Sequence, residues 1–172
     1  MLEIINNLKP FFEDCYRRIN VREYSRIMKI SPPTASKVLF NLNKKDLLLM
    51  EKDRNYIFFY ANKNYNIFID LSRIYWKVKL KDLTETLSRN TTSPSIILFG
   101  SLSKAETKSD SDIDICIIGH KKGKICLCLK DFENKLKRKI QMFFFTSIKD
   151  IKNKELANNI INGCLIEGKL RL

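Results

Sequence analysis

The sequence predicts an α+β protein built from more than one part, and three observations lead to this prediction. Two β-branched, apolar runs at 96–99 and 113–118 indicate neighbouring buried strands in the C-terminal half. Residues 21–60 have the pattern of helix, turn, helix and hairpin, and residues 66–88 place apolar side chains at helical spacing, with a bend near 79–81. The expected parts are an N-terminal part at 1–66, a helical linker at 67–94 and a C-terminal α/β part at 95–172 with a mixed sheet.

The N-terminal part is predicted from the spacing of its apolar residues and from one break. Ser31 followed by two prolines is a typical helix start, because Ser caps the first turn and Pro fits within it. The expected elements are helices over 2–14, 21–29 and 33–43, and strands over 47–50 and 56–60 around a turn at 52–55.

This order of elements resembles a winged helix-turn-helix, which implies duplex DNA as a partner. In that fold the second helix enters the major groove and the hairpin, or wing, contacts the backbone. The residues expected to contact nucleic acid are Thr34, Ser36, Lys37 and Asn41 on the helix and Lys52 and Arg54 at the tip of the wing. The alternative is a scaffold or dimer surface whose charges are only solvated.

The C-terminal part contains the pattern with the clearest chemistry. Gly100-Ser101 follows the first β-branched run, and after a gap of ten residues Asp112 and Asp114 open the second. Alternate residues of a strand share a face, so these two carboxylates lie roughly 7 Å apart along the chain. Two adjacent carboxylates repel each other unless a cation neutralises them, and hard oxygen ligands suit Mg²⁺. Gly100-Ser101 offers backbone N–H groups and a hydroxyl to a phosphate.

These residues resemble the signature of the DNA polymerase beta nucleotidyltransferase superfamily, in particular its small, single-domain members. The resemblance implies that Asp112 and Asp114 are the metal ligands and catalytic residues, and that Mg²⁺ and a nucleoside triphosphate such as ATP are bound. The implied nucleotide-binding residues are Gly100, Ser101, Lys104 and Ser111. Members usually have Gly where Ala105 stands. Lys104 neutralises the triphosphate or is simply a surface lysine.

One position departs from the superfamily pattern. Members place a third acid on a later strand, where it often activates the attacking hydroxyl, but the corresponding strand at 140–145 has Gln141. A glutamine side chain does not accept a proton at neutral pH, although its carbonyl orients a hydroxyl weakly. The other elements expected in this part are a basic loop at 120–124, a helix at 131–136, a helix from 147 onward and a strand at 164–167.

Other chemistries have weaker support. His120 is the single histidine and is expected in a surface loop, and no phosphate-binding loop of the G-x-x-x-x-G-K-[ST] type is present. Asp110 is expected to be a turn residue. The five cysteines are expected to be reduced thiols, because Cys126 and Cys128 lack the spacing of zinc ligands.

Composition limits the partners and the compartment. The net charge of +13 favours polyanions such as nucleic acid or nucleotides without identifying one. No apolar run approaches 18 residues, and the first residues lack the features of a signal peptide, so we expect a cytoplasmic protein with no membrane partner.

Two functions from different classes follow. The first is an Mg²⁺-dependent nucleotidyltransferase that moves a nucleoside monophosphate, AMP from ATP, onto a hydroxyl of a macromolecule. Superfamily members that modify a tyrosine of a partner toxin suggest a protein acceptor. The second is a DNA-binding transcriptional regulator whose nucleotidyltransferase-like domain is weak or inactive and senses nucleotide. Gln141 favours the second, and Gly100-Ser101 with the two aspartates favours the first.

Overall fold

The computed structural model describes residues 2–91, 94–119 and 129–170, which form two compact units. The first unit comprises the chain up to Tyr75 together with Ala105–Ser109, and the second comprises Trp76–Lys104 and the chain from Asp110 onward. The predicted division at 66 and 94 stays a prediction, and residues of the expected linker occur in both units.

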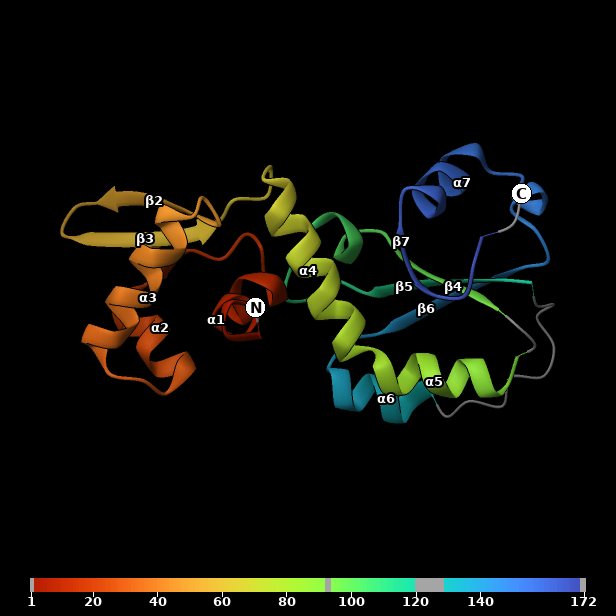
Figure 1. Ribbon diagram of the computed structural model, residues 1–172, viewed down its shortest axis with the longest axis horizontal. Helices are drawn as coiled ribbons and strands as arrows, with labels where there is room; N and C mark the ends of the chain where they lie inside the picture. The colour runs from red at the N-terminus through yellow and green to blue at the C-terminus, as the bar shows by residue number, and fades with distance from the viewer. Residues whose placement is uncertain (1, 92–93, 120–128, 171–172) are drawn as a thin grey trace. The chain divides into compact units, whose positions relative to one another are not determined.

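The first unit consists of helices and a small antiparallel sheet (Figure 1). Its strands lie in the order β1-β3-β2. Its elements are α1 (Leu2–Glu13), β1 (Ile19–Asn20), α2 (Val21–Met28), α3 (Pro32–Lys44), β2 (Leu48–Asp53), β3 (Tyr56–Ala61) and most of α4 (Asn66–Lys79). The helix-helix-hairpin order matches the prediction, and β1 was missed because two residues are too few for a periodic signal. The winged helix-turn-helix assignment stays a prediction.

Local side-chain chemistry defines the helix starts. Ser31 caps α3, with Pro32 and Pro33 in the first turn, so this prediction is confirmed. Asn20 caps α2 in the same way, its side-chain oxygen accepting a hydrogen bond from the Glu23 N–H at 3.0 Å. α2 ends at Met28, and the next residue, Lys29, has a φ of 55° and therefore turns the chain out of the helix.

The predicted turn at 52–55 is wrong in its length. β2 continues to Asp53, which pairs with Tyr56, so only Arg54 and Asn55 form the loop. Arg54 has a φ of 53°, as a two-residue hairpin loop of this kind requires. Lys52 consequently lies within the strand, opposite Ile57, and Arg54 alone of the two basic residues is at the tip.

The core of the first unit is aromatic. Phe12 packs against Phe68 with ring centroids 5.2 Å apart, and Phe11 stacks on Tyr24 at 6.2 Å. The Tyr24 hydroxyl donates to the Asn7 carbonyl oxygen at 2.7 Å, and burial raises its pKa. This satisfied hydroxyl lets a fully buried tyrosine stabilise the core.

The second unit is built on a mixed four-stranded sheet in the order β6-β5-β4-β7. β5 pairs antiparallel with β4 and parallel with β6. Its remaining elements are α5 (Lys81–Arg89), β4 (Ser95–Phe99), η1 (Leu102–Lys104), β5 (Ile113–Ile118), α6 (Leu129–Leu136), β6 (Ile140–Phe145), η2 (Ile148–Asp150), α7 (Lys154–Ile161) and β7 (Cys164–Glu167). The predicted strands and the mixed sheet are confirmed.

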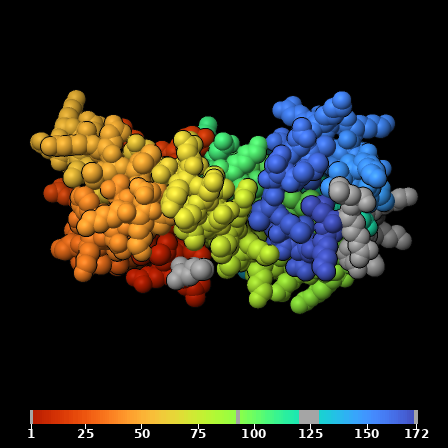
Figure 2. Space-filling view, turned by 45° about the horizontal axis from the view of Figure 1, so that its top comes forward, coloured from red at the N-terminus to blue at the C-terminus, as the bar shows by residue number. Residues whose placement is uncertain are grey.

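Helices cover both faces of this sheet. Figure 1 shows α5 and α6 on one face and α7 on the other. Ile97, Cys116 and Ile118 pack with Ile160 of α7. In the space-filling view the blue C-terminal segments lie in front of green ones (Figure 2). Alternate residues of a strand share a face, so the side chains of Asp112 and Asp114 lie on the same face as Cys116. This is the face that α7 covers, because Cys116 packs with Ile160.

The helix predicted from 147 onward is interrupted. Ser147 and Asp150 form a capping box around the short turn η2, and Ile151 then adopts an extended conformation. Asn153 caps a new helix, α7, by accepting from the Leu156 N–H at 3.0 Å. Two successive caps divide what the apolar spacing alone predicts as one helix. No helix in the part of the chain that the structure describes is long and apolar enough to cross a membrane.

Candidate active site

The two predicted acids lie together at the start of β5. Asp112 directly precedes the strand and Asp114 is its second residue, and both are half-buried. Ile113 and Ile115 between and after them are fully buried on the opposite face. The alternation predicted from the sequence therefore holds, and it directs both carboxylates to one side of the sheet.

The acid pair carries an electrostatic cost. The pKa of the Asp114 carboxyl is raised, first by its burial and then by the negative charge of Asp112. Ionising both groups is thus unfavourable without a neighbouring cation. A divalent ion between them would remove this cost, which is the physical reason for regarding the pair as a metal site.

Gly100 lies directly against this pair. It follows β4, whose last residue, Phe99, is opposite Asp114 in the sheet. Gly100 has a φ of 71°, and a Cβ added to it would lie 2.2 Å from Asp114 Oδ2. Any other residue would displace the carboxylate. Ser103 fixes the turn by donating from its hydroxyl to the Gly100 carbonyl oxygen at 2.9 Å.

Gln141 is the third side chain at the site. β6 places it opposite Asp114, and its Nε2 donates to Asp112 Oδ2 at 2.7 Å. The expectation that residue 141 faces the acid pair is therefore confirmed. A neutral amide donor stands where a third carboxylate would otherwise be, and it occupies one oxygen of Asp112.

The remaining predicted residues have partners that the sequence did not indicate. Lys104 is exposed and its Nζ donates to Asn159 Oδ1 of α7 at 2.9 Å. The Ser111 carbonyl oxygen accepts from Arg138 Nη1 at 2.7 Å, and the Arg138 side chain is buried over the Trp76 ring at 5.3 Å. Arg138 thus fixes the backbone just before Asp112. It is one of three consecutive basic residues, so nothing in the sequence distinguishes it.

The donor set fits Mg²⁺ in one specific way. Among the described residues, no group of three or more His, Cys, Asp or Glu side chains is placed to hold a metal. Two carboxylates are sufficient for Mg²⁺ when phosphates and water complete its octahedral shell. Asp112 and Asp114 would hold the ion, and a nucleotide would supply most of the other ligands.

Comparison with known families gives one match. The model of the family described as polymerase beta, nucleotidyltransferase matches residues 81–169, just over half of the chain. The chain belongs to the polymerase beta nucleotidyltransferase family. No curated protein matches it.

The matched region of this nucleotidyltransferase family member contains β4, β5, β6 and β7 and hence the acid pair, Gly100 and Gln141. It does not include residues 1–80, so the family match leaves the predicted winged helix-turn-helix untested.

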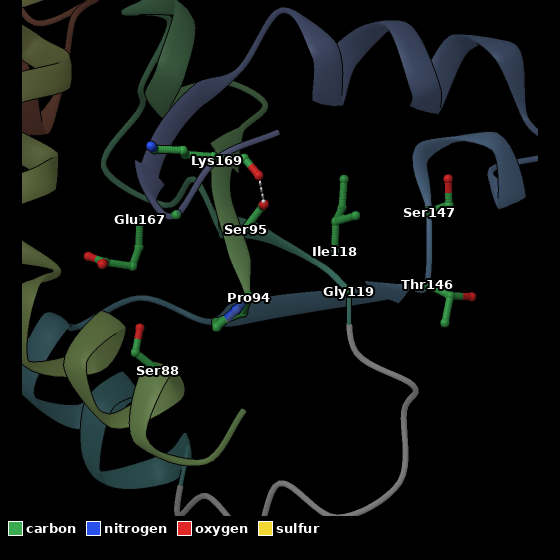
Figure 3. A pocket seen from close by; sticks show the side chains of 10 residues that line it. Ser88, Pro94, Ser95, Ile118, Gly119, Thr146, Ser147, Glu167 and Lys169 are labelled. Atoms are coloured by element: carbon green, nitrogen blue, oxygen red, sulfur yellow. Dashed lines mark hydrogen bonds between the residues drawn. The ribbon is translucent and has the colours of Figure 1, made fainter. Parts of the chain in front are cut away.

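A pocket of about 610 Å³ lies at the other end of the same sheet (Figure 3). Ser95 donates to the Lys169 carbonyl oxygen at 2.6 Å on one side of it, and Thr146 and Ser147 line the opposite side. None of the predicted site residues lines it. β5 runs from Asp114 to the Ile118 wall over four residues, roughly 13 Å, so this pocket is separate from the acid pair.

Most residues predicted to contact nucleic acid are exposed. Thr34, Lys37 and Asn41 line a hollow of about 430 Å³ between α3 and α1, to which Glu3 contributes an acid. Ser36 is half-buried, and the Thr34 hydroxyl shares a hydrogen bond with the Ser31 hydroxyl at 2.8 Å.

The outer face of the hairpin is less basic than its tip. Arg18 forms an ion pair with Glu51 at 3.2 Å and lies over the Phe58 ring at 4.9 Å. Asp53 is 3.9 Å from the same guanidinium. Lys52 and Arg54 are exposed.

Several predictions concern cysteine and histidine. Cys15 and Cys116 are buried free thiols, and burial raises their pKa to about 11 and about 12. They are therefore unreactive packing residues. His120, the loop at 120–124, Cys126 and Cys128 lie outside the described residues.

Proposed function

We propose that this protein is an Mg²⁺-dependent nucleotidyltransferase that moves a nucleoside monophosphate, AMP from ATP, onto a hydroxyl of a macromolecular acceptor, of which a partner protein is the first candidate. The observation that carries the proposal is the half-buried acid pair against Gly100, within a region that matches the nucleotidyltransferase family. Mg²⁺, when bound, would neutralise phosphate charge during the transfer.

The residues of the chain would act mainly by positioning and by charge. Asp112 and Asp114 would hold the cation, and the backbone N–H groups of Gly100-Ser101 would receive the phosphates. The acceptor oxygen attacks the α-phosphorus, the bond from this phosphorus to the bridging oxygen breaks, and pyrophosphate leaves. The hydroxyl proton passes to water, because Gln141 accepts no proton.

The amide at position 141 predicts a slow enzyme. General-base catalysis typically contributes about 10²–10⁴ in rate. The residue of β6 that pairs with Asp114 is Gln141, which cannot act as a general base. Its bond to Asp112 instead holds the carboxylate in place before the cation arrives. Gln141 is therefore a positioning residue in this proposal.

The products distinguish this reaction from other uses of ATP. The protein, Mg²⁺, ATP and a macromolecular fraction that co-purifies with the protein should yield one pyrophosphate for each AMP attached. Formation of ADP or inorganic phosphate without pyrophosphate would show hydrolysis or phosphoryl transfer and would contradict the proposal.

The Gln141–Asp112 hydrogen bond also favours a second candidate, a DNA-binding regulator whose second unit senses nucleotide. The hydrogen bond from the Gln141 amide stabilises the acid pair without a third carboxylate. Binding of a nucleotide, unlike its transfer, needs no general base. The basic hairpin tip and the exposed α3 residues would contact the DNA.

This candidate predicts salt-dependent binding of duplex DNA. Replacing Lys52 and Arg54 by Ala should reduce the slope of log K against log salt by about one unit for each lost phosphate contact. The titration should use the full chain, because a fragment ending at residue 66 lacks Phe68 and Ala105 of the first unit's core. Lys152→Ala with Lys154→Ala in the second unit is the matched control. A parent protein that does not bind duplex DNA at low salt would contradict this candidate.

A further inference from the structure

Arg138 is a charged side chain inside the second unit. It is 8 % exposed, and no other charged side chain is buried among the residues that the structure describes. It lies just beyond the end of α6, where Lys137 has a φ of 55° and turns the chain out of the helix. The Arg138 N–H donates to the Glu133 carbonyl oxygen at 3.2 Å. The end of α6 therefore fixes the backbone from which this side chain extends.

Two hydrogen bonds hold the backbone on either side of Asp112. Arg138 Nη1 donates to the Ser111 carbonyl oxygen at 2.7 Å. The Ile113 N–H donates to the Lys139 carbonyl oxygen at 2.8 Å, at the point where β5 begins to pair with β6. The bond to Lys139 involves only backbone atoms, so any residue at 139 would accept it. The bond to Ser111 depends on the arginine side chain.

Gln141 holds the same residue from the same strand. Its side chain donates to the Asp112 carboxylate, whereas Arg138 acts on the backbone that carries this carboxylate. Asp112 directly precedes β5, so pairing within the sheet fixes the chain only from Ile113 onward. A site keeps its geometry only when the backbone beneath its side chains is also fixed. Arg138 supplies this support on the side of Asp112 that the sheet does not reach.

The surroundings hold the guanidinium in place. Its Cζ lies 5.3 Å from the centroid of the Trp76 ring, which is fully buried and belongs to the same unit. Burying a charged group costs desolvation free energy, so a buried cation is weak evidence for stability. A planar guanidinium against an aromatic ring presents its N–H groups in a fixed direction, which a flexible ammonium does not. The burial of Arg138 therefore favours a role in geometry.

We propose that Arg138 is a positioning residue for the acid pair, because it fixes the Ser111 backbone and thereby the place from which Asp112 binds the cation. Arg138 itself contacts neither cation nor nucleotide. The proposal rests on the proposed function for the identity of the ligand, Mg²⁺ with ATP, and not for the order of the acid pair itself. Residues that orient metal ligands from outside commonly contribute 10- to 100-fold to metal affinity.

Two substitutions of Arg138 and one control test the proposal. Arg138→Met removes the donor, and Arg138→Lys keeps the charge and one donor without the planar fork. Lys139→Met is the matched control, because it removes the same charge from the neighbouring, exposed residue and leaves its carbonyl in place. Thermal unfolding of each full-length variant identifies those that fold. If Arg138→Met does not fold, Arg138→Lys serves for the same comparison, with a smaller expected loss.

Calorimetry with ATP, with and without Mg²⁺, separates positioning from a general loss of structure. Arg138→Met should raise the Kd for ATP about tenfold when Mg²⁺ is present and leave the Kd without Mg²⁺ unchanged. Arg138→Lys should recover part of this loss, and Lys139→Met should change neither affinity. An equal loss with and without Mg²⁺, or no loss in a folded Arg138 variant, would overturn the proposal.

Amide hydrogen exchange tests the positioning without nucleotide. Arg138→Met should speed exchange of the Ile113 amide relative to the amides of β4, and Lys139→Met should not. If the parent binds no ATP but exchange responds as stated, the proposed function fails and the positioning role stands. Exchange that is unchanged at Ile113, or that rises equally along β4, would show that Arg138 does not act on the acid pair and would overturn the proposal.

Discussion

Replacing Asp112 and Asp114 together by Asn is expected to abolish Mg²⁺-dependent binding of ATP to the full chain. Partners one shell away from a metal commonly contribute 10- to 100-fold to its affinity, so losing both direct ligands should cost at least about a hundredfold. Calorimetry with ATP, with and without Mg²⁺, measures this directly. Asp110→Asn is the matched control, since Asp110 is an exposed acid on the same loop and should leave the affinity unchanged.

The double substitution should not unfold the metal-free protein. The pKa of Asp114 is raised in the folded state by burial and by Asp112, so its ionisation opposes folding. This cost is absent below the pKa of the unfolded chain and develops as pH rises through the folded pKa. At pH 7 the Asn variant should therefore be at least as stable as the parent in thermal unfolding. Parent-like ATP affinity in a folded variant would show that the acids are not ligands.

Gln141→Glu is expected to accelerate nucleotide transfer by some part of the 10²–10⁴ that a general base contributes. The new carboxylate would lie opposite Asp114 and next to Asp112, where it accepts the proton of the attacking hydroxyl. It also replaces a hydrogen bond by repulsion, so the acceleration should require saturating Mg²⁺. Single-turnover transfer to a co-purified acceptor is the measurement.

Gln141→Leu separates the base from the loss of the amide. It removes the hydrogen bond to Asp112 and supplies no proton acceptor, so it should not accelerate transfer and should weaken Mg²⁺-ATP binding. If the parent and Gln141→Glu both bind ATP and neither transfers AMP, the result favours the nucleotide-sensing regulator over the enzyme.

The sequence was sufficient where local patterns carry the information. Strong β-branched runs defined β4 and β5, and alternation placed Asp112 and Asp114 on one face. The position of Gln141 beside the acids was expected only from the superfamily resemblance, and β6 places it opposite Asp114. Ser31 and its prolines defined the start of α3.

The sequence was insufficient where long-range contacts decide. Arg138 and Asn159 fix Ser111 and Lys104 from distant elements, and neither stands out from its neighbours in the chain. The break between η2 and α7 depends on two polar caps inside an apolar periodicity. Membership of Ala105–Ser109 in the first unit depends on the burial of two small residues, which no spacing rule reveals.

The central claim is that the acid pair and Gly100-Ser101 form a nucleotidyltransferase site. ATP labelled at the α-phosphate, and in parallel at the γ-phosphate, should be incubated with Mg²⁺, the acceptor fraction and either the parent or the Asp112→Asn, Asp114→Asn variant. The account predicts that the α label becomes covalently attached to a macromolecule with the parent only, and that the γ label does not. Attachment of the γ label, or equal attachment of the α label by parent and variant, would contradict it.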